Sequence, residues 1–245
     1  ANMGITAEKV AEKYGIPRER QDEFGLQSNR RALQAIEQGK FKEEIVPVNV
    51  ERSKVKNNKL EKTTELVDID DGPRDSTPEK MAKLKTPFKQ DGTVTAGNSS
   101  QMTDGAAVTM VVSEDFLKKL GQDPMARFVG YDVQGVPPEL MGIGPSKAIP
   151  GVLDKCGFSL DDIGLVELNE AFASQALYCM DTVGLSQDYV NVNGGAIALG
   201  HPLGCTGAKL TTTLLHEMHR RDVKYGLVSM CIGGGMGAAG ILERV

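Results

Sequence analysis

The residues most able to do chemistry lie in three glycine-containing loops. His201 sits between Gly200 and Pro202. Histidine titrates near neutrality, so this residue can move a proton or donate a hydrogen bond to a developing oxyanion. Cys231 ends an apolar segment before a glycine turn, where a thiol of lowered pKa can act as a nucleophile or as an acid/base group. Asn169 follows another apolar segment and can hold a water or a substrate oxygen.

Each of these three residues also has a simpler structural interpretation. His201 can be a structural loop histidine, Cys231 a small buried hydrophobe, and Asn169 the cap of a helix that begins at Glu170. All three follow predicted strands, however, and open α/β sheets bind ligands outside the carboxyl ends of their strands. Their joint placement therefore favours an active site.

The elements that must position these loops alternate along the rear of the chain. Apolar runs bounded by glycine predict strands, and amphipathic spacing between them predicts helices. Such alternation indicates a layered α/β core. The predicted strands are 106–112, 128–133, 164–168, 225–231 and 238–243, and the predicted helices are 114–120, 146–155, 170–183 and 207–220.

The front of the chain is different in composition. Residues 1–92 hold 35 charged side chains, against 26 in the much longer remainder, and we place a boundary near Gly92. The pattern predicts one helix capped by Thr6 and ending near Tyr14, and a second over 18–38. A strand is expected over 42–50 and a polar, irregular segment over 51–75. We interpret this front part as a solvated lid.

Composition excludes several classes of function. The 245 residues carry a net charge of −5, so there is no general electrostatic reason to bind nucleic acid or an acidic membrane. No apolar run approaches the length needed to span a bilayer. The four cysteines are well separated and lack CxxC spacing, which favours a reducing compartment, and we expect the cytoplasm.

Three segments resemble well-known functional motifs but lack the spacing that those motifs require. Residues 235–240 satisfy GxGxxG, but only five residues follow for the helix and strand that a dinucleotide fingerprint requires. Residues 204–209 lack the adjacent Gly-Lys of a phosphate loop. The histidines at 216 and 219 are three residues apart, unlike the HExxH of zinc proteases. We expect no metal site.

Six blocks, in order along the chain, resemble those of the thiolase family. The resemblance covers essentially the whole sequence and is strongest for the 3-ketoacyl-CoA and acetyl-CoA acyltransferases. The blocks are Met-Gly-Ile-Thr-Ala-Glu at 3–8, Thr-Ala-Gly-Asn-Ser-Ser at 95–100, Met-Gly-Ile-Gly-Pro at 141–145, Asn-Glu-Ala-Phe at 169–172, Asn-Gly-Gly-Ala through Gly-His-Pro-Leu-Gly-Cys-Thr-Gly at 193–207, and Cys-Ile-Gly-Gly-Gly-Met-Gly at 231–237.

The resemblance implies a fold and an activity. The fold would be a thiolase-like αβαβα layered core, present only in part, with a helical lid. Residues 1–92 would form a lid that receives CoA, 93–125 the remnant of an N-terminal core domain, and 126–245 a C-terminal core domain. The activity would be acyl-CoA:acetyl-CoA C-acyl transfer, a reversible condensation and thiolysis of 3-ketoacyl-CoA, with CoA as a substrate and no permanently bound cofactor.

The resemblance also implies roles for particular residues. His201 would assist the acylated nucleophile and donate to the thioester oxyanion, and Asn169 would order a water in the same oxyanion hole. Cys231 would be the acid/base group, and the Gly233 N–H would contribute to a second oxyanion hole. Residues that would line the pantetheine and acyl pocket are Met3, Ser100, Met141, Ala171 and Phe172.

One feature of the family pattern has no counterpart here. In thiolases the nucleophilic cysteine precedes the block that starts at Met3, and none of the four cysteines replaces it by motif. We therefore expect the C-terminal portion of a thiolase, completed by an N-terminal segment or a partner chain, and a homo-oligomer, dimer or tetramer. The alternative hypothesis is a non-catalytic CoA-binding or assembly subunit that keeps the fold.

Overall fold

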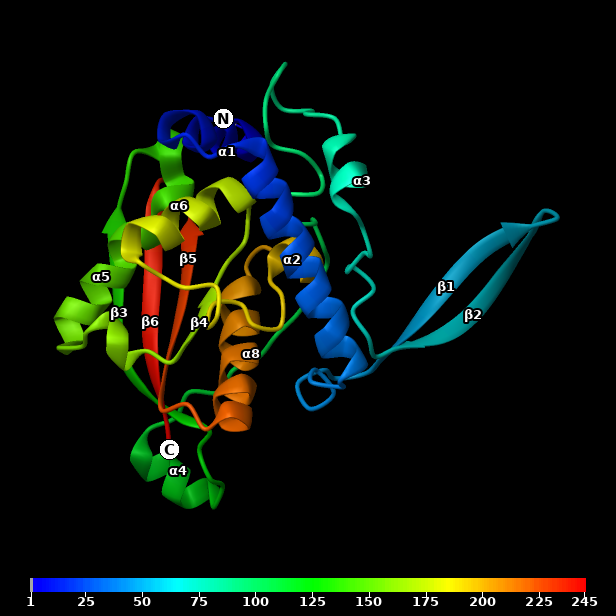
Figure 1. The fold of residues 1–245 in the computed structure, drawn as a ribbon. Coiled ribbons are helices and arrows are strands. Elements are labelled where there is room, and N and C mark those ends of the chain that lie inside the picture. The colour runs from blue at the N-terminus through cyan, green and yellow to red at the C-terminus, as the bar shows by residue number, and fades with distance from the viewer. Residues whose placement is uncertain (1) are drawn as a thin grey trace.

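The computed structural model describes residues 2–245, and its centre is a four-stranded sheet in the order β3-β6-β5-β4 (Figure 1). The strands are β3 (Ala126–Gly135), β6 (Met236–Arg244), β5 (Tyr225–Ile232) and β4 (Leu165–Leu168). β6 runs antiparallel to both neighbours, whereas β4 and β5 are parallel, so the carboxyl ends of β4 and β5 meet at one edge of the sheet. The predicted α/β class is confirmed.

Helices cover both faces of this sheet because side chains alternate along the buried strand β4. Val166 and Leu168 pack in the core with α5 (Pro145–Cys156) and α6 (Ala173–Val183). Leu165 faces the opposite way, into a cluster with Leu214 and Met218 of α8 (Thr206–Arg221). Figure 1 shows α8 on one side of the strands and α5 on the other. The short helices η1 (Pro138–Ile143), η2 (Leu160–Asp162) and α7 (Ala196–Leu199) complete this part.

Two helices from the front of the chain pack onto the same body. They are α1 (Met3–Tyr14) and α2 (Arg18–Glu37), close to the predicted spans. The cap of α1 is Asn2, whose Oδ1 accepts from Gly4 N at 3.0 Å; Thr6 lies inside the helix, so its predicted capping role is wrong. Phe24 of α2 is part of the main core.

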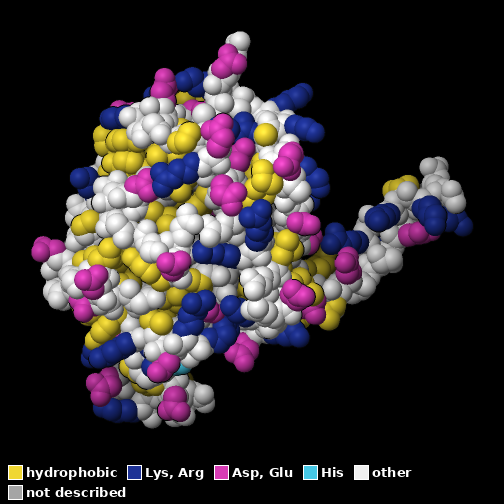
Figure 2. Space-filling model, viewed as in Figure 1, with side chains coloured by type: hydrophobic (Ala, Val, Ile, Leu, Met, Phe, Trp, Pro, Cys, Tyr) yellow, Lys and Arg dark blue, Asp and Glu magenta, His cyan; other side chains and the backbone are white. Residues whose placement is uncertain are grey.

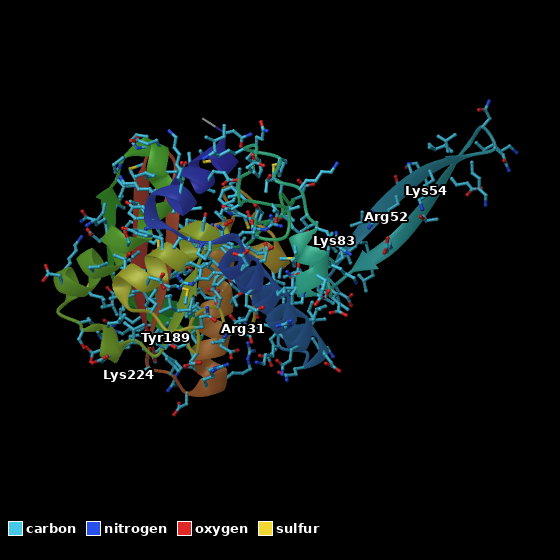
Figure 3. All side chains as sticks on the ribbon, turned by 45° about the horizontal axis from the view of Figure 1, so that its top comes forward. Arg31, Arg52, Lys54, Lys83, Tyr189 and Lys224 are labelled. Atoms are coloured by element: carbon cyan, nitrogen blue, oxygen red, sulfur yellow. The ribbon has the colours of Figure 1, made fainter. Side chains whose placement is uncertain are left out.

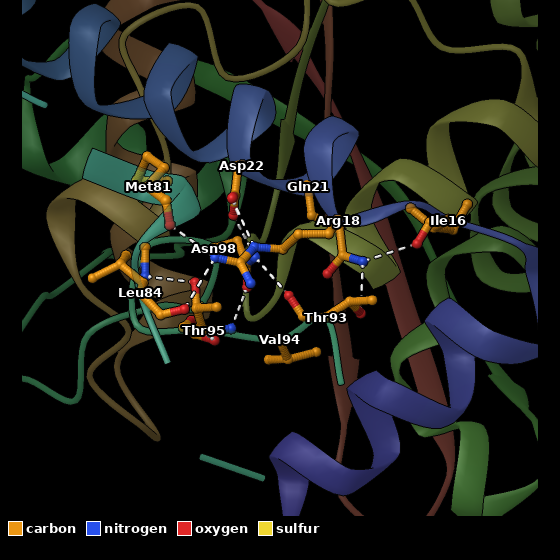
Figure 4. A network of polar contacts seen from close by, with 12 residues as sticks. Ile16, Arg18, Gln21, Asp22, Met81, Leu84, Thr93, Val94, Thr95 and Asn98 are labelled. Carbon is orange, nitrogen blue, oxygen red and sulfur yellow. Dashed lines mark hydrogen bonds and ion pairs between the residues drawn. The ribbon is translucent and has the colours of Figure 1, made fainter. Parts of the chain in front are cut away.

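A network of polar contacts ties α2 to the segment 93–98 and to α3 (Pro78–Ala82) (Figure 4). Arg18 donates to Asp22 Oδ2 at 2.7 Å and to Met81 O at 2.8 Å. Asn98 Nδ2 donates to Asp22 Oδ1 at 2.8 Å and to Thr93 O at 3.0 Å. This network fixes the loop that leads to Ser100.

The segment after α2 corrects two predictions. Residues 40–44 form turns, so the strand expected over 42–50 begins only at β1 (Val48–Lys56). The segment expected to be irregular contains β2 (Lys59–Val67), which pairs antiparallel with β1 as a hairpin. Asn57 and Asn58 turn the chain with φ of 48° and 60°, the left-handed conformation that a two-residue hairpin loop requires.

The hairpin β1–β2, which we call the arm, projects from the body (Figures 1 and 2). Its two faces are exposed along nearly the whole length. Figure 3 shows Arg52 and Lys54 on β1, far from the sheet. The arm escaped prediction because both faces carry charged and polar side chains, which gives no alternation of apolar and polar residues.

A third correction concerns the expected strand at 106–112. This segment has no regular structure, and Val108 and Val111 are 89% and 81% exposed. Within residues 2–245 no strand lies beside it, so its backbone groups would have no ladder partner. The helix that follows is present as α4 (Glu114–Leu120). Among the described helices, none combines the length and the apolar character needed to cross a membrane.

Candidate active site

Asn169 and His201 are brought together from two loops at the carboxyl edge of the sheet. Asn169 Nδ2 lies 3.4 Å from His201 Nε2. Asn169 directly follows β4, and its N–H donates to Ser229 O of β5 at 2.9 Å, which extends the strand pairing by one residue. It does not cap a helix, because α6 begins at Ala173 rather than at Glu170. The buried Asn169 Oδ1 has no hydrogen-bond partner among the described residues.

Backbone geometry places His201. Its N–H donates to Gln101 O at 3.0 Å. Gln101 Nε2 in turn donates to Ala198 O at 3.1 Å and to Gly72 O at 2.8 Å. Gly200 has φ +85°, and a Cβ there would lie 2.4 Å from Thr103 Cγ2. Only glycine therefore fits at the residue before His201.

Hydrogen bonds also set the protonation of the His201 ring. Thr206 Oγ1 donates to Pro202 O at 3.0 Å, so it accepts from His201 Nδ1–H at 2.5 Å. This leaves Nε2 as the unprotonated nitrogen, facing Asn169. Burial, together with the nearby Lys209 cation, lowers the pKa of His201, so the ring is neutral at pH 7. Nε2 can therefore accept a proton from a substrate or a nucleophile.

Glu170 fastens the site loops to one another and to α2. Its buried carboxylate accepts from Ser28 Oγ at 2.6 Å, from Asn191 Nδ2 at 2.8 Å and from Ile197 N at 3.2 Å. Burial raises the pKa of Glu170, although the Ser28 and Asn191 hydrogen bonds oppose this. A Cβ at Gly195 would lie 2.2 Å from Glu170 Cδ, so the chain passes close to the carboxylate.

Arginine from α2 supports the same loop from outside. Arg31 donates to Val190 O at 2.8 Å and to Gln187 O at 2.7 Å. Figure 3 labels Arg31 on α2 and Tyr189, which lies between these two acceptors in sequence. The segment before α7 is thus held by a residue more than 150 positions away.

Cys231 lies near the end of β5 and is linked to Asn169 through Gln175. Cys231 Sγ is 3.7 Å from Gln175 Oε1, and Gln175 Nε2 donates to Asn169 O at 3.2 Å. Burial raises the pKa of Cys231 to about 11. The lowered pKa that a nucleophilic thiolate would need is therefore not found. At pH 7 this group is a neutral thiol, which can donate a proton.

Gly233 opens the turn after β5. A Cβ built on Gly233 would meet no atom within 4 Å, so its backbone borders open space. Gly235 in the same turn is closely packed, since a Cβ there would lie 2.5 Å from Val136 O. The turn is therefore anchored at one end and accessible at the other.

The five expected pocket residues lie in three places. Ser100 N donates to Ala171 O at 2.9 Å, and Phe172, at the N-cap of α6, forms a bridge with the residue before Ser100. Met141 is half-buried in η1, beside Gly142, whose Cβ would lie 2.7 Å from Gln175 Cβ. Met3 stands apart: it starts α1 and is 43% exposed, and its carbonyl accepts from Thr6 Oγ1 of the same helix.

Several residues of this arrangement escaped sequence reasoning, among them Glu170 as a network centre, Ser28, Gln175 and Thr206. Thr206 could have been found, because it lies five residues after His201 within the same block. Ser28 could not, because it meets Glu170 across 142 positions. Within residues 2–245 there is no group of three or more His, Cys, Asp or Glu side chains placed to hold a metal ion.

This fold and this loop arrangement match a known class of protein. The thiolase N-terminal domain model matches residues 1–115, and the thiolase C-terminal domain model matches residues 122–244. The chain therefore belongs to the thiolase family. It is 52% identical over 244 residues to the 3-ketoacyl-CoA thiolase of Bacillus subtilis, an alignment that covers 99% of this chain and 62% of that protein.

Solved structures agree. The crystal structure of the Bacillus anthracis acetyl-CoA acetyltransferase matches with a TM-score of 0.91 and 47% identity, over 99% of this chain and 60% of that one. Human mitochondrial 3-ketoacyl-CoA thiolase, solved in complex with CoA, matches with a TM-score of 0.88 and 43% identity, over 99% of this chain and 59% of that one. The chain thus spans about 60% of the length of these relatives.

Proposed function

We propose that this chain carries the acid/base and oxyanion-binding part of a thiolase that transfers acyl groups between CoA thioesters. The observation that carries the proposal is the His201–Asn169 pair, with the unprotonated Nε2 of a neutral imidazole 3.4 Å from the Asn169 amide. Family membership and the CoA complex of the human relative support CoA as the substrate.

In the proposed thiolysis, His201 Nε2 takes the proton of a nucleophilic thiol, which then attacks the ketone carbon of a 3-ketoacyl-CoA. The bond between the ketone carbon and the neighbouring α-carbon breaks. The neutral Cys231 thiol gives its proton to the resulting carbanion, which leaves as acetyl-CoA. The Cys231 thiolate then regains a proton from a CoA thiol, whose sulfur attacks the acyl-enzyme. The bond between the acyl carbon and the nucleophilic cysteine breaks, the shortened acyl-CoA is released, and the His201 imidazolium returns its proton to the freed cysteine sulfur.

Oxyanions form twice in this sequence of steps. The imidazolium of His201 and a water held by Asn169 would stabilise one of them, and the Gly233 N–H would stabilise the other. Asn169 Oδ1, which is buried and unpartnered among the described residues, supports a role in orienting a water. We assign the contacts with the pantetheine and acyl groups to Ser100, Ala171 and Phe172. Met141 of η1 and Met3 of α1 would add further contacts with the same groups.

We infer that the acyl-carrying cysteine is not one of the four in this chain. Cys179 is fully buried, with its thiol 3.6 Å from Gly142 O, and Cys156 packs in α5 against the core. Cys205 precedes α8 and has no base in hydrogen-bonding contact among the described residues. We place the nucleophile in the part of the relatives' length that this chain does not span.

The test compares this chain alone with a full-length enzyme. In that enzyme the chain is joined to the part of the relatives' length that it does not span. Thiolysis of acetoacetyl-CoA should be absent with this chain alone and present in the full-length enzyme. His201→Asn and Cys231→Ala in the full-length enzyme should each lower kcat by about 10²–10⁴, whereas Cys156→Ala, as matched control, should leave it unchanged. Turnover by this chain alone would refute the missing-nucleophile inference, and full activity of His201→Asn would refute the function.

We further propose a homo-oligomer, dimer or tetramer, in a reducing compartment such as the cytoplasm. The four free cysteines support the compartment. Apolar side chains on the arm and in the segment 101–125 support association, since 95% of Met102 and 62% of Leu60 are exposed. We retain the division into a lid at 1–92, a remnant at 93–125 and a core domain at 126–245. Light scattering of the full-length enzyme measures the subunit number directly.

A further inference from the structure

A lysine that the proposed reaction does not use lies directly behind the His201 loop. Lys209 belongs to the first turn of α8, and its Nζ lies 3.5 Å from Leu199 O and 3.4 Å from Gly200 O. Gly200 is the residue before His201, so the ammonium group contacts the peptide unit from which the imidazole extends. These two contacts are long for charged hydrogen bonds, and the ammonium group therefore has capacity for other partners.

The Lys209 charge acts on carboxyl groups from three separate segments. Glu44 comes from the turns after α2, Asp70 from the chain after the arm, and Glu167 from the centre of β4. Glu44 is held by Thr213 of α8, whose hydroxyl donates to Oε1 at 3.4 Å. Glu44 Oε2 and Glu167 Oε1 are buried and have no hydrogen-bond partner among the described residues.

The electrostatic environment of this group depends on the lysine. Burial raises the pKa of Glu44 to about 7 and raises those of Asp70 and Glu167, while the Lys209 charge opposes all three shifts. Other charged groups that act on these carboxyls are Asp71, Glu170, Glu217 and Arg220. Lys209 is half-buried, and its positive charge favours the ionised form of each of these acids.

We propose that Lys209 is a positioning residue for His201: its ammonium group fixes the Leu199 and Gly200 carbonyls, and thereby the peptide unit from which the imidazole extends. The expected effect of Lys209 on catalysis rests on the proposed function of His201. Its expected effect on the titration of the ring does not depend on that function. The lysine charge also acts on the imidazole, because it opposes protonation of His201. Lys209 therefore contributes both to the position of the ring and, together with burial, to its charge state.

The experiment is an NMR pH titration of the histidine rings. The chain has only three histidines, and His216 and His219 serve as references in the same spectra. Lys209→Met should shift the His201 titration to higher pH, because the opposing cation is gone. Lys209→Arg, which keeps the charge, should restore the wild-type titration. Lys209→Gln keeps a hydrogen-bond donor but removes the charge, so it should shift the His201 titration to higher pH without loosening the loop. It replaces Lys209→Met in the experiment if that variant does not fold.

The matched control is Lys118→Met, since the Lys118 side chain is 67% exposed on α4. In the full-length enzyme, Lys209→Met should lower kcat/KM about tenfold through misplacement of the ring, with recovery in Lys209→Arg. An unchanged His201 titration in folded Lys209→Met or Lys209→Gln would overturn the proposal. Full activity of His201→Asn would instead refute the proposed function while the titration result stood.

Discussion

The loops around His201 and the arm differ in how this chain holds them. Around His201, buried hydrogen bonds arrive from α2, from β4 and from the loop before α7, and most end on Glu170, Asn191 or Gln101. The arm has its own backbone ladder and two exposed cross-strand ion pairs, Arg52–Glu65 at 2.5 Å and Lys62–Glu51 at 2.7 Å.

These two kinds of contact differ in strength. Exposed ion pairs contribute at most about 1 kcal/mol each, and an isolated two-stranded hairpin is marginal in water. Buried hydrogen bonds cost much more to break, because their partners are left unsatisfied away from water. The site loops are therefore fixed by residues within this chain, whereas the arm gains little from the rest of it.

The largest expected effect comes from removing the centre of the site network. Glu170→Ala leaves the Ser28 hydroxyl and the Ile197 N–H without this acceptor and removes one of the two acceptors of Asn191 Nδ2. We expect the free energy of unfolding to fall by about 3 kcal/mol or more, and thiolysis by the full-length enzyme to be lost. Denaturant unfolding and the acetoacetyl-CoA assay measure the two effects.

The control for this prediction lies in the other region. Glu61→Ala on β2 removes an exposed carboxylate of the arm and should change the unfolding free energy by less than about 0.5 kcal/mol. Equal destabilisation by Glu170→Ala and Glu61→Ala would contradict the contrast between the two regions.

A pair of leucines tests packing in the same way. Leu214 of α8 is fully buried between the helix and the sheet, whereas Leu60 on the arm is 62% exposed. Leu214→Ala should lower the free energy of unfolding by about 2–5 kcal/mol, because it leaves a cavity. Leu60→Ala should cost less than about 0.5 kcal/mol in the monomer. A larger cost for Leu60→Ala that grows with protein concentration would show that a second copy covers the arm.

The sequence predicted these two regions with unequal success. Strands of the sheet body were found from short apolar runs, as at Leu165–Leu168, and helices from apolar residues at helical spacing, as along α8. The loops that carry Asn169, His201 and Cys231 follow from those strands. The arm was missed because neither of its faces is buried, although the Asn57-Asn58 pair was a usable turn signal.

Two further misses have a different origin. The apolar run at 106–112 looks like a strand, but a strand needs a neighbour, and residues 2–245 provide none beside it. The roles of Ser28 and Gln175 depend on contacts across long sequence separations, which no local pattern encodes. Residue types thus indicated where chemistry occurs, while the supporting contacts required the fold.

A smaller effect, on the order of 1 kcal/mol, is expected from the pH dependence of Glu44. Burial raises the pKa of Glu44 to about 7, above the value of about 4.3 in an unfolded chain. The folded state then binds the proton more tightly, so this group lowers the free energy of unfolding as pH rises from about 4.3 through 7. Glu44→Gln should remove that decrease.

We therefore compare the free energy of unfolding of Glu44→Gln with that of wild type at pH 4 and at pH 8. The difference should be more favourable to the variant at pH 8 than at pH 4, by on the order of 1 kcal/mol. Urea unfolding at the two pH values measures it. Glu43→Gln is the matched control, since the neighbouring Glu43 side chain is 82% exposed. A pH-independent difference for Glu44→Gln would show that the carboxyl has the same pKa in the folded and unfolded states.

The smallest effect tests whether the arm is a separate unit of stability. Asn58 has φ +60°, a conformation that glycine adopts at no steric cost, so Asn58→Gly should stabilise the arm by a few tenths of a kcal/mol. Amide hydrogen exchange at Val55 and Leu60 should slow slightly, while exchange in β5 should not change, because the arm opens without unfolding the sheet. If the Val55 and Leu60 amides instead exchange only with global unfolding, the arm must be held by contacts beyond its own ladder. Dependence of that protection on protein concentration would then identify a second copy as their source.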